Sequence, residues 1–185
     1  MANSLWNGGA GLTVDWAKLQ AALNYYQENG FTYVEVPWLV SPNITRMTFE
    51  KGAGCFSTTR GDLIGSAEQG FLSILDSLES NKHYVALTPC FRDEPYLDKY
   101  HQYYFMKVEL FVKQPKSFKD RLNLFSFLAL KLAEENTSRN LGFDRDDLKV
   151  ELANRTWLEL GSYTGNDQWA CGTGWAEPRW SQALK

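Results

Sequence analysis

The 185-residue sequence predicts an α+β fold built around a largely antiparallel sheet. Strand-like segments outnumber helical ones, and hairpin-like loops join them in place of the long crossovers that parallel strands need. The composition, 44% hydrophobic and 22% charged, is typical of a folded domain with a substantial core. No repeat or linker-like stretch indicates a boundary, so we expect residues 1–185 to form a single domain.

The first predicted elements are a helix and a strand. Asp15 is a favourable N-cap, apolar residues recur behind it at helical spacing, and Gly30 is placed to end the helix. Residues 31–36 are aromatic and β-branched, and Pro37 ends the strand that they predict. Residues 41–65, punctuated by glycine, are predicted to be an irregular loop. The apolar positions of the helix are Trp16, Leu19, Leu23 and Tyr26.

The middle of the chain predicts a second helix and a hairpin. Residues 66–69, Ser-Ala-Glu-Gln, have the form of a capping box and precede an apolar stripe at helical spacing. Residues 84–92 and 103–113 are strand-like, and the polar stretch 93–102 between them is typical of a long hairpin loop. We therefore expect these two strands to pair antiparallel.

The last third predicts the longest helix and further strands. Ser117 opens that helix, which is predicted to run until Gly142. Residues 149–153 and 156–161 predict a strand pair, and a short helical segment is expected at 178–185. The helical stripe consists of Phe118, Leu122, Phe125, Ala129 and Leu132.

Charge, hydropathy and cysteine content exclude several classes of protein. With 19 Lys and Arg against 22 Asp and Glu, the net charge of −3 argues against a module that binds mainly the nucleic-acid backbone. No apolar run reaches the roughly 20 residues of a membrane span, and no basic residue precedes Lys18, so we expect no membrane association and a cytoplasmic location. Three cysteines are too few for a disulfide framework, which leaves reduced thiols or metal ligands, and Cys55 has no assigned role.

The most informative segment is Cys-Phe-Arg-Asp-Glu at residues 90–94. On a strand, Cys90, Arg92 and Glu94 share one face, so a guanidinium and a carboxylate project together. An arginine fork binds a phosphate or a carboxylate with two hydrogen bonds. The alternative is a surface hairpin carrying an ordinary Arg–Glu ion pair.

Three segments together resemble the class II aminoacyl-tRNA synthetases. Phe91-Arg-Asp-Glu94, a variable loop, His101 and the strand Phe105–Glu109 resemble motif 2 of that family. Residues 30–37, which follow a helix and end in proline, resemble motif 1, which forms the family's dimer interface. Residues 172–179, Gly-Thr-Gly-Trp-Ala-Glu-Pro-Arg, resemble motif 3, in which a glycine-rich strand leads into a helix carrying an arginine.

Two further matches point to the seryl-type subclass. Ser66-Ala-Glu68 resembles the TxE element that helps to bind the substrate amino group, and Glu159-Leu-Gly-Ser162 resembles the ExxS element that holds magnesium. The five segments occur in the family's order. The resemblance therefore implies an antiparallel sheet flanked by helices, over most of the chain.

For the nucleotide, the resemblance implies that Arg92 contacts the α-phosphate of ATP and the carboxylate being activated. Glu94 would contact the adenine amino group, Phe105 would stack beneath the base, and Arg179 would bind the γ-phosphate. His101 would contact the triphosphate or order its loop. In this interpretation, Arg92 and Arg179 are the catalytic residues.

For the amino acid and metals, the resemblance implies two further sets of residues. Glu68, Arg92, Glu109 and Thr173 would contact the amino acid, and Glu159 and Ser162 would hold Mg²⁺. Some atypical seryl-type relatives, including ligases that load amino acids onto carrier proteins, bind zinc through Cys, Glu and Cys. Here Cys90, Glu109 and Cys171 would be the ligands.

Simpler interpretations of these residues remain open. Glu68 and Gln69 satisfy a helix cap, Phe105 can be an ordinary core residue, and Glu159 can be a charge on a solvent-facing strand. Cysteine is among the most buried residue types and needs no metal to explain it.

The resemblance thus implies an enzyme that uses ATP and Mg²⁺ to adenylate an amino acid, and it implies a homodimer. We expect 185 residues to leave no room for a tRNA-binding domain, so a tRNA acceptor is not favoured. The acceptor stays open, and one alternative is a carrier protein, a modified nucleotide or a small amine. The alternative is a catalytically silent synthetase paralogue that serves as a binding or regulatory subunit. The sequence does not identify the amino acid, since side-chain specificity depends on the shape of the pocket.

Overall fold

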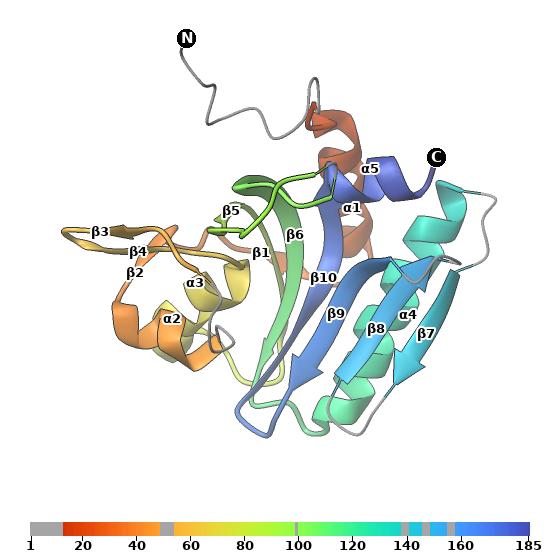
Figure 1. Ribbon diagram of the computed structural model, residues 1–185. Helices are drawn as coiled ribbons and strands as arrows, with labels where there is room; N and C mark the ends of the chain where they lie inside the picture. Colours follow the sequence, from red (N-terminus) through yellow and green to blue (C-terminus); the bar gives the residue numbers. More distant parts are fainter. Residues whose placement is uncertain (1–12, 49–53, 99, 138–140, 146–148, 155–157) are drawn as a thin grey trace, which may run out of the picture.

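The computed structural model describes residues 13–48, 54–98, 100–137, 141–145, 149–154 and 158–185. Helices α1 and α4 cover one face of a large twisted sheet, and a smaller sheet lies beside its opposite face together with α2 and α3 (Figure 1). No helix in the described ranges is long and apolar enough to cross a membrane. In chain order the elements are α1 (Trp16–Glu28), β1 (Thr32–Tyr33), β2 (Leu39–Val40), α2 (Pro42–Thr48), β3 (Ser57–Thr58), β4 (Gly61–Leu63), α3 (Ala67–Ser73), the 3-10 turn η1 (Leu75–Ser77), β5 (His83–Phe91), β6 (Tyr104–Lys113), α4 (Phe118–Glu135), β7 (Leu141–Arg145), β8 (Lys149–Asn154), β9 (Glu159–Gly165), β10 (Trp169–Glu177) and α5 (Arg179–Ala183).

Within the described residues the large sheet has seven strands in the order β1-β5-β6-β10-β9-β8-β7. Every pair is antiparallel except β1 with β5, which is parallel. The predicted hairpin is confirmed, because β5 pairs with β6 from His83 opposite Val112 to Phe91 opposite Tyr104. The α+β class with a largely antiparallel sheet is therefore confirmed.

The predicted helix caps are present at both long helices. The Asp15 carboxylate accepts a hydrogen bond of 3.1 Å from the Lys18 amide at the start of α1, and Ser117 accepts one of 3.2 Å from the Asp120 amide at the start of α4. Gly30 follows α1 with a φ of +87°, a conformation that glycine adopts without steric cost. Both helices thus begin where the sequence indicates.

Three sequence predictions need correction. The strand expected at 31–36 is reduced to Thr32–Tyr33, which pair in parallel with Tyr84 and Val85 of β5. The helix from Ser117 ends at Glu135, and Gly142, expected to end it, instead lies in β7 opposite Ala153 of β8. Part of the strand expected at 156–161 lies outside the described residues, and β9 begins at Glu159 and extends to Gly165.

The stretch 41–65 is also more regular than predicted. It contains α2 and, with β2, a small sheet in the order β2-β4-β3. The carboxylate of Asp62 accepts hydrogen bonds from the hydroxyl groups of Thr45 (2.6 Å) and Ser57 (2.7 Å), which lower its pKa. The strands of this small sheet are two or three residues long, too short to show a periodic pattern in the sequence. Side-chain contacts between residues distant in sequence stabilise the small sheet instead.

The core forms on both faces of the large sheet. On one face α1 packs closely on β10: the Tyr26 hydroxyl donates a hydrogen bond of 3.0 Å to the Gly174 carbonyl, and a Cβ at position 174 would lie 2.7 Å from the Tyr26 ring. On the other face Phe71 of α3 stacks on Phe111 of β6, with 4.6 Å between ring centroids. The sheet is therefore fixed between two layers.

Candidate active site

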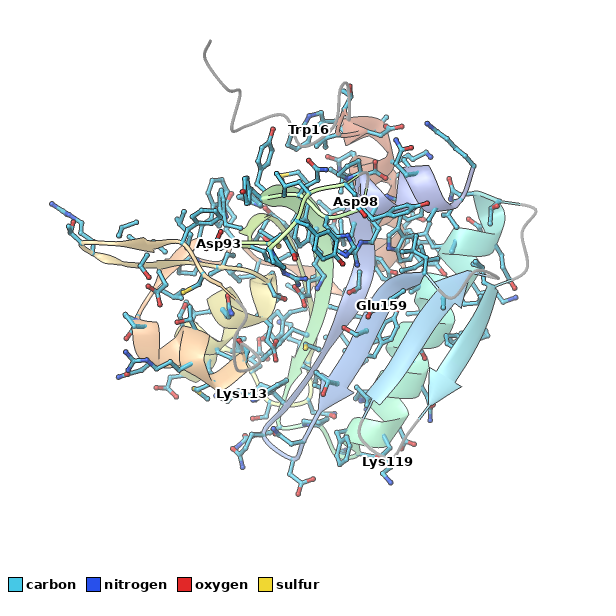
Figure 2. All side chains as sticks on the ribbon, in the orientation of Figure 1. Trp16, Asp93, Asp98, Lys113, Lys119 and Glu159 are labelled. Carbon is cyan, nitrogen blue, oxygen red and sulfur yellow. The ribbon has the colours of Figure 1, made fainter. Side chains whose placement is uncertain are left out.

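A cleft with about 540 Å³ of empty space, including its solvent-open part, lies where β6, β9 and β10 meet the loop after β5. Asp98 of that loop and Glu159 of β9 lie toward one end of the sheet, whereas Lys113 and Lys119 lie at the other end (Figure 2). Seven of the sequence-predicted site residues line the cleft: Arg92, Glu94, Phe105, Glu159, Ser162, Thr173 and Arg179. The fold thus brings together residues that are more than 80 positions apart in the sequence.

Arg92 extends the β5–β6 hairpin by one residue, since its amide donates to the Tyr103 carbonyl at 2.9 Å. Its Nε donates to the Gly65 carbonyl at 3.1 Å, and its guanidinium carbon lies 5.1 Å from the centroid of the Phe105 ring. The side chain is therefore fixed by a neutral acceptor and an aromatic face. The terminal nitrogens remain as the donors that can meet an anion in the cleft.

Arg179 begins α5 and is anchored in a similar way. Its Nε and Nη2 donate to the Tyr100 carbonyl at 3.3 and 3.2 Å. Burial, and then the nearby Arg92 guanidinium, lower the pKa of Arg179, while Glu159, Glu94 and Asp98 oppose this effect. Two mutually repelling guanidinium groups therefore share one cleft, and an anion placed between them would relieve the repulsion.

The loop that carries Tyr100 is ordered by Asp98. The Asp98 carboxylate accepts hydrogen bonds of 2.7 Å from the amides of Tyr100 and His101, and its Oδ1 lies 2.9 Å from the His101 Nδ1. Burial raises the pKa of Asp98, but these hydrogen bonds outweigh it and the pKa is lowered. His101, expected to contact the triphosphate or to order its loop, contacts Asp98 within the loop and is not among the residues that line the cleft.

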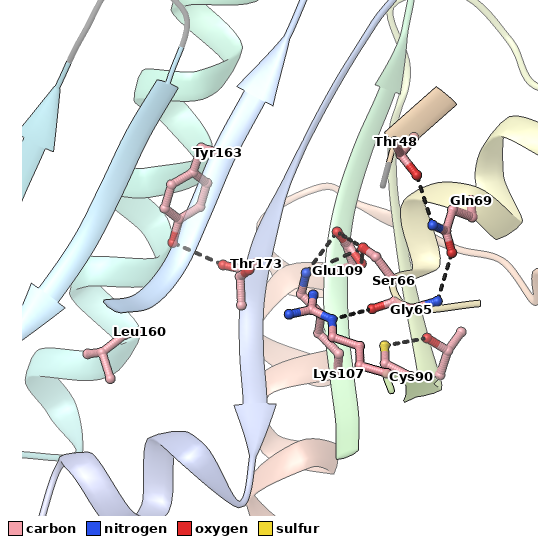
Figure 3. Close-up of polar contacts among 12 residues, drawn as sticks. Thr48, Gly65, Ser66, Gln69, Cys90, Lys107, Glu109, Leu160, Tyr163 and Thr173 are labelled. Carbon is pink, nitrogen blue, oxygen red and sulfur yellow. Dashed lines mark hydrogen bonds and ion pairs between the residues drawn. The ribbon is translucent and has the colours of Figure 1, made fainter. Parts of the chain in front are cut away.

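A second group of polar residues, which we call the acid cluster, lies beside the cleft and consists of Ser66, Glu68, Lys107, Glu109 and Cys171. The Lys107 Nζ lies 3.0 Å from the Glu109 carboxylate, and both side chains are almost fully buried. The Ser66 hydroxyl lies 2.7 and 2.6 Å from the two Glu109 oxygens (Figure 3). Glu68 and Glu109, predicted to contact the amino acid, are thus buried here, and only Lys107 of the cluster lines the cleft.

The predicted capping box at 66–69 is wrong, although Ser66 is the N-cap of α3. Its side chain makes no capping hydrogen bond and points instead to Glu109. The Gln69 side chain accepts from the Gly65 amide at 2.7 Å and donates to the Thr48 hydroxyl at 2.8 Å (Figure 3). The polar residues of this turn therefore join α2, α3 and the middle of β6.

Glu68 has an unusual protonation equilibrium. Burial and then the Glu109 carboxylate raise its pKa to about 7, and the Lys107 ammonium and a hydrogen bond with Cys171 only partly oppose this. A carboxyl group with this pKa changes charge near neutral pH. It can become ionised when a cation arrives beside it.

The residues proposed for zinc do not fit that metal. Burial raises the pKa of Cys90 to about 11 and the pKa of Cys171 well above its ordinary value, so both are protonated thiols at neutral pH unless a metal lies beside them. The Lys107 ammonium already pairs with the Glu109 carboxylate that would be the third ligand. Across the described ranges, no group of three or more His, Cys, Asp or Glu residues could hold a metal ion.

Glu159 and Ser162 fit a different kind of metal site. Both line the cleft from β9, and Glu159 acts electrostatically on Arg179 across it. A carboxylate and a hydroxyl are the hard oxygen ligands that Mg²⁺ accepts beside substrate phosphates.

Two further groups of the site, the Lys107 side chain and the Tyr100 carbonyl, are not predicted from the sequence. Lys107 could have been found, because it lies between Phe105 and Glu109 in the alternating pattern of β6 and so shares their face. The Tyr100 carbonyl carries no side-chain signal, since any residue type provides it.

Comparison with solved structures shows which fold this is. Seryl-tRNA synthetase from Pyrococcus horikoshii complexed with ATP superposes with a TM-score of 0.75 over 91% of this chain and 49% of that chain, at 18% sequence identity. The chain has the fold of a class II synthetase catalytic core. The pyrrolysyl-tRNA synthetase PylSc from Desulfitobacterium hafniense has a TM-score of 0.71 over 90% of this chain and 67% of that chain, at 14% identity. The cytoplasmic serine-tRNA ligase from Naegleria fowleri in complex with AMP has a TM-score of 0.70 over 91% of this chain and 47% of that chain, at 14% sequence identity.

The chain spans about half the length of the two seryl-type synthetases. No protein-family model and no curated protein sequence matches it. The similarity confirms the class II synthetase-like fold that the motifs predicted.

Proposed function

We propose that this protein activates an amino acid by forming an aminoacyl-adenylate from ATP. The observation that carries the proposal is the pair Arg92 and Arg179, both anchored to backbone carbonyls and both lining one cleft. Two fixed cations with free donors suit a triphosphate, whose charge shifts between phosphoryl oxygens during transfer. The class II synthetase fold supports the same proposal.

Each nucleotide-site residue has a role in this proposal. Phe105, already against the Arg92 guanidinium, stacks beneath the adenine, and Glu94 accepts from its amino group. Arg92 holds the α-phosphate and Arg179 the γ-phosphate. The amino-acid carboxylate attacks the α-phosphorus, the bond to the bridging oxygen of the β-phosphate breaks, and pyrophosphate leaves.

Magnesium would be held by Glu159 and Ser162 together with the phosphates. When bound, the metal supplies Lewis-acid stabilisation of the charge on the phosphoryl oxygens. The side chains themselves orient the triphosphate between β9 and the first turn of α5.

The amino acid would lie between Arg92, Thr173 and the acid cluster. Glu68 and Glu109 provide negative charge for its ammonium group, and Lys107 lines the cleft beside them. The acceptor of the activated amino acid is a carrier protein, a nucleotide or a small amine, each of which provides the nucleophile that an acyl-adenylate needs.

The test is amino-acid-dependent exchange between pyrophosphate and ATP, screened over the common amino acids with Mg²⁺. We expect exchange with at least one amino acid, and a loss of about a hundredfold or more in Arg92→Ala, because a preorganised charge contact is removed. Arg60→Ala is the matched control, since Arg60 is an exposed residue between β3 and β4 and should leave exchange unchanged.

A well-folded sample that binds ATP but exchanges with no amino acid would instead support a silent paralogue that serves as a binding subunit. Full activity in Arg92→Ala would remove Arg92 from the site. The first result concerns the activity itself, and the second concerns the role of Arg92.

We also propose that the protein is a homodimer through α1 and β1. Trp16 is 60% exposed and Tyr33 is 39% exposed, large apolar side chains on the elements that resemble the family's interface motif. Light scattering should report about twice the chain mass of 21.2 kDa at micromolar concentration. A mass equal to one chain would contradict this.

A further inference from the structure

Glu177, the last residue of β10, is fully buried and belongs to neither the cleft nor the acid cluster. Its Oε1 accepts hydrogen bonds from the Trp175 indole at 2.6 Å and from the Ser181 hydroxyl at 2.8 Å. Its Oε2 is buried and has no hydrogen-bond partner among the described residues. A buried carboxylate that is only half satisfied is costly, and an apolar residue of similar size would often be more stable there.

The register of β10 explains why Glu177 lies on the face away from the cleft. The pairing with β6 shifts between Thr173 and Trp175, and after this bulge Ala176 lies opposite Lys107 while Glu177 lies opposite Met106. Ala176 and Arg179 then line the cleft, whereas Glu177 faces the helical layer. Glu177 on the helical face and Arg179 in the cleft are therefore only two residues apart in the sequence.

A chain of hydrogen bonds connects Glu177 to α1. The Lys18 ammonium donates to the Ser181 hydroxyl at 3.1 Å, and that hydroxyl donates to Glu177. Lys18 also lies 5.9 Å from the centroid of the Trp175 ring. Three elements, α1, β10 and α5, are thus joined at Glu177, two positions before Arg179. The Lys18 ammonium is linked to the Glu177 carboxyl group through the Ser181 hydroxyl.

We propose that Glu177 is a positioning residue that, with Ser181 and Lys18, fixes the first turn of α5 and so holds the Arg179 guanidinium in the cleft. This inference rests on the proposed function, in which Arg179 binds the γ-phosphate of ATP. Arg179 reaches the Tyr100 carbonyl from one side of the first turn of α5, and Ser181 holds the same turn from the other side. Loss of the Ser181–Glu177 bond would let the turn move and displace Arg179 from the phosphate.

The test compares the affinities of ATP and AMP, measured by calorimetry with Mg²⁺, because AMP lacks the phosphate that Arg179 is proposed to hold. We expect Ser181→Ala and Glu177→Gln to weaken ATP binding about tenfold and AMP binding less than twofold. Ser126→Ala is the matched control, since Ser126 is a buried helical serine that donates to the Asn123 carbonyl on α4, away from the cleft. It should change neither affinity.

The same measurement in an Arg179→Ala background decides whether Glu177 acts through Arg179. There, Glu177→Gln should add no further loss of ATP affinity. The inference is overturned if Ser181→Ala and Glu177→Gln weaken ATP and AMP binding equally, or if they weaken neither. It is also overturned if Glu177→Gln causes its full loss of ATP affinity in the Arg179→Ala background. If Glu177→Gln does not fold, Ser181→Ala and Lys18→Met give the same comparison.

The outcome is separate from that of the proposed function. A wild-type protein that prefers ATP to AMP but shows no amino-acid exchange contradicts adenylation, while the Glu177 comparison can still be made in full. A wild-type protein without preference for ATP removes the role of Arg179, and the inference falls with it.

Discussion

The nucleotide half of the cleft and the acid cluster lie side by side, yet their charges are compensated in opposite ways. Arg92 and Arg179 donate to the neutral carbonyls of Gly65 and Tyr100, so their positive charge is not cancelled by those contacts. In the acid cluster, Lys107 and Glu109 pair directly at 3.0 Å, and their side chains are 9% and 2% exposed. The first region keeps charge available for a ligand, and the second uses most of its charge internally.

This difference has a consequence for mutations. Removing an arginine that is held by a neutral carbonyl leaves no buried charge behind, so it should cost function with little loss of stability. Removing one member of a buried ion pair leaves the other charged and unpaired. Variants of the two regions should therefore separate activity from folding.

The largest expected effect is on stability, in Lys107→Met. The methionine keeps the volume of the side chain but leaves the Glu109 carboxylate buried without its cation, which costs about 3 to 5 kcal/mol of the free energy of unfolding. Urea denaturation followed by tryptophan fluorescence measures this change. Lys131→Met is the control: Lys131 pairs with Glu134 at 3.1 Å, both are about half exposed, and its loss should cost at most about 1 kcal/mol.

The double variant Lys107→Met with Glu109→Leu sharpens the comparison. Because no charge is then left unpaired, most of the lost stability should return. If Lys107→Met is as stable as the wild type, the pair does not stabilise the fold and the contrast between the two regions does not hold.

The next effect is a dependence of stability on pH that comes from Glu68. Its pKa of about 7 lies above the ordinary 4.5, because it is buried and faces Glu109, with Lys107 and Cys171 only partly opposing. Between these values the native state keeps a proton that the unfolded chain has released. The unfolded state therefore binds fewer protons, and stability falls as the pH rises from about 4.5 to 7 and then levels off.

Glu68→Gln removes this contribution. The stability of the wild type relative to Glu68→Gln should fall by about 2 kcal/mol between pH 5 and pH 8, measured by urea denaturation at both values. The exposed Glu134→Gln serves as the reference, with no comparable change. If the difference in the free energy of unfolding between the wild type and Glu68→Gln is the same at pH 5 and pH 8, Glu68 ionises normally.

The contrast between the two regions also explains what the sequence could predict. The hairpin β5–β6 and helices α1 and α4 follow from periodicity and caps such as Asp15 and Ser117. The short elements β2, β3 and β4 do not, because contacts such as Asp62 with Thr45 decide them. The edge strand β7 was missed because Gly142 was interpreted as the end of a helix.

The site was predictable where residues project from regular strands or follow them directly. Arg92, Glu94 and Phe105 could be placed from alternation on β5 and β6, and the structure brings them to one cleft. The contact of Ser66 with Glu109 was not predictable, because residues 66–69, Ser-Ala-Glu-Gln, also match the sequence pattern of a capping box. The position of Glu177 depends on the bulge in β10, which leaves no signature in residue type.

The smallest expected effect concerns Glu159 in the nucleotide half. If Glu159 is one of several oxygen ligands of Mg²⁺, Glu159→Ala weakens metal binding without abolishing it, since the phosphates and Ser162 remain. We expect exchange to fall about tenfold when Mg²⁺ is limiting and to recover in part when Mg²⁺ is raised. The measurement is a titration of exchange activity with Mg²⁺ at fixed ATP.

Arg179→Ala provides the comparison within the same cleft. Its defect should stay constant over the titration, because a guanidinium that binds phosphate directly is not replaced by more metal. Glu134→Ala, on the exposed surface of α4, should follow the wild-type curve. A Glu159→Ala defect that is equally large at every Mg²⁺ concentration would remove Glu159 from the metal site and leave it as a carboxylate that only orients Arg179.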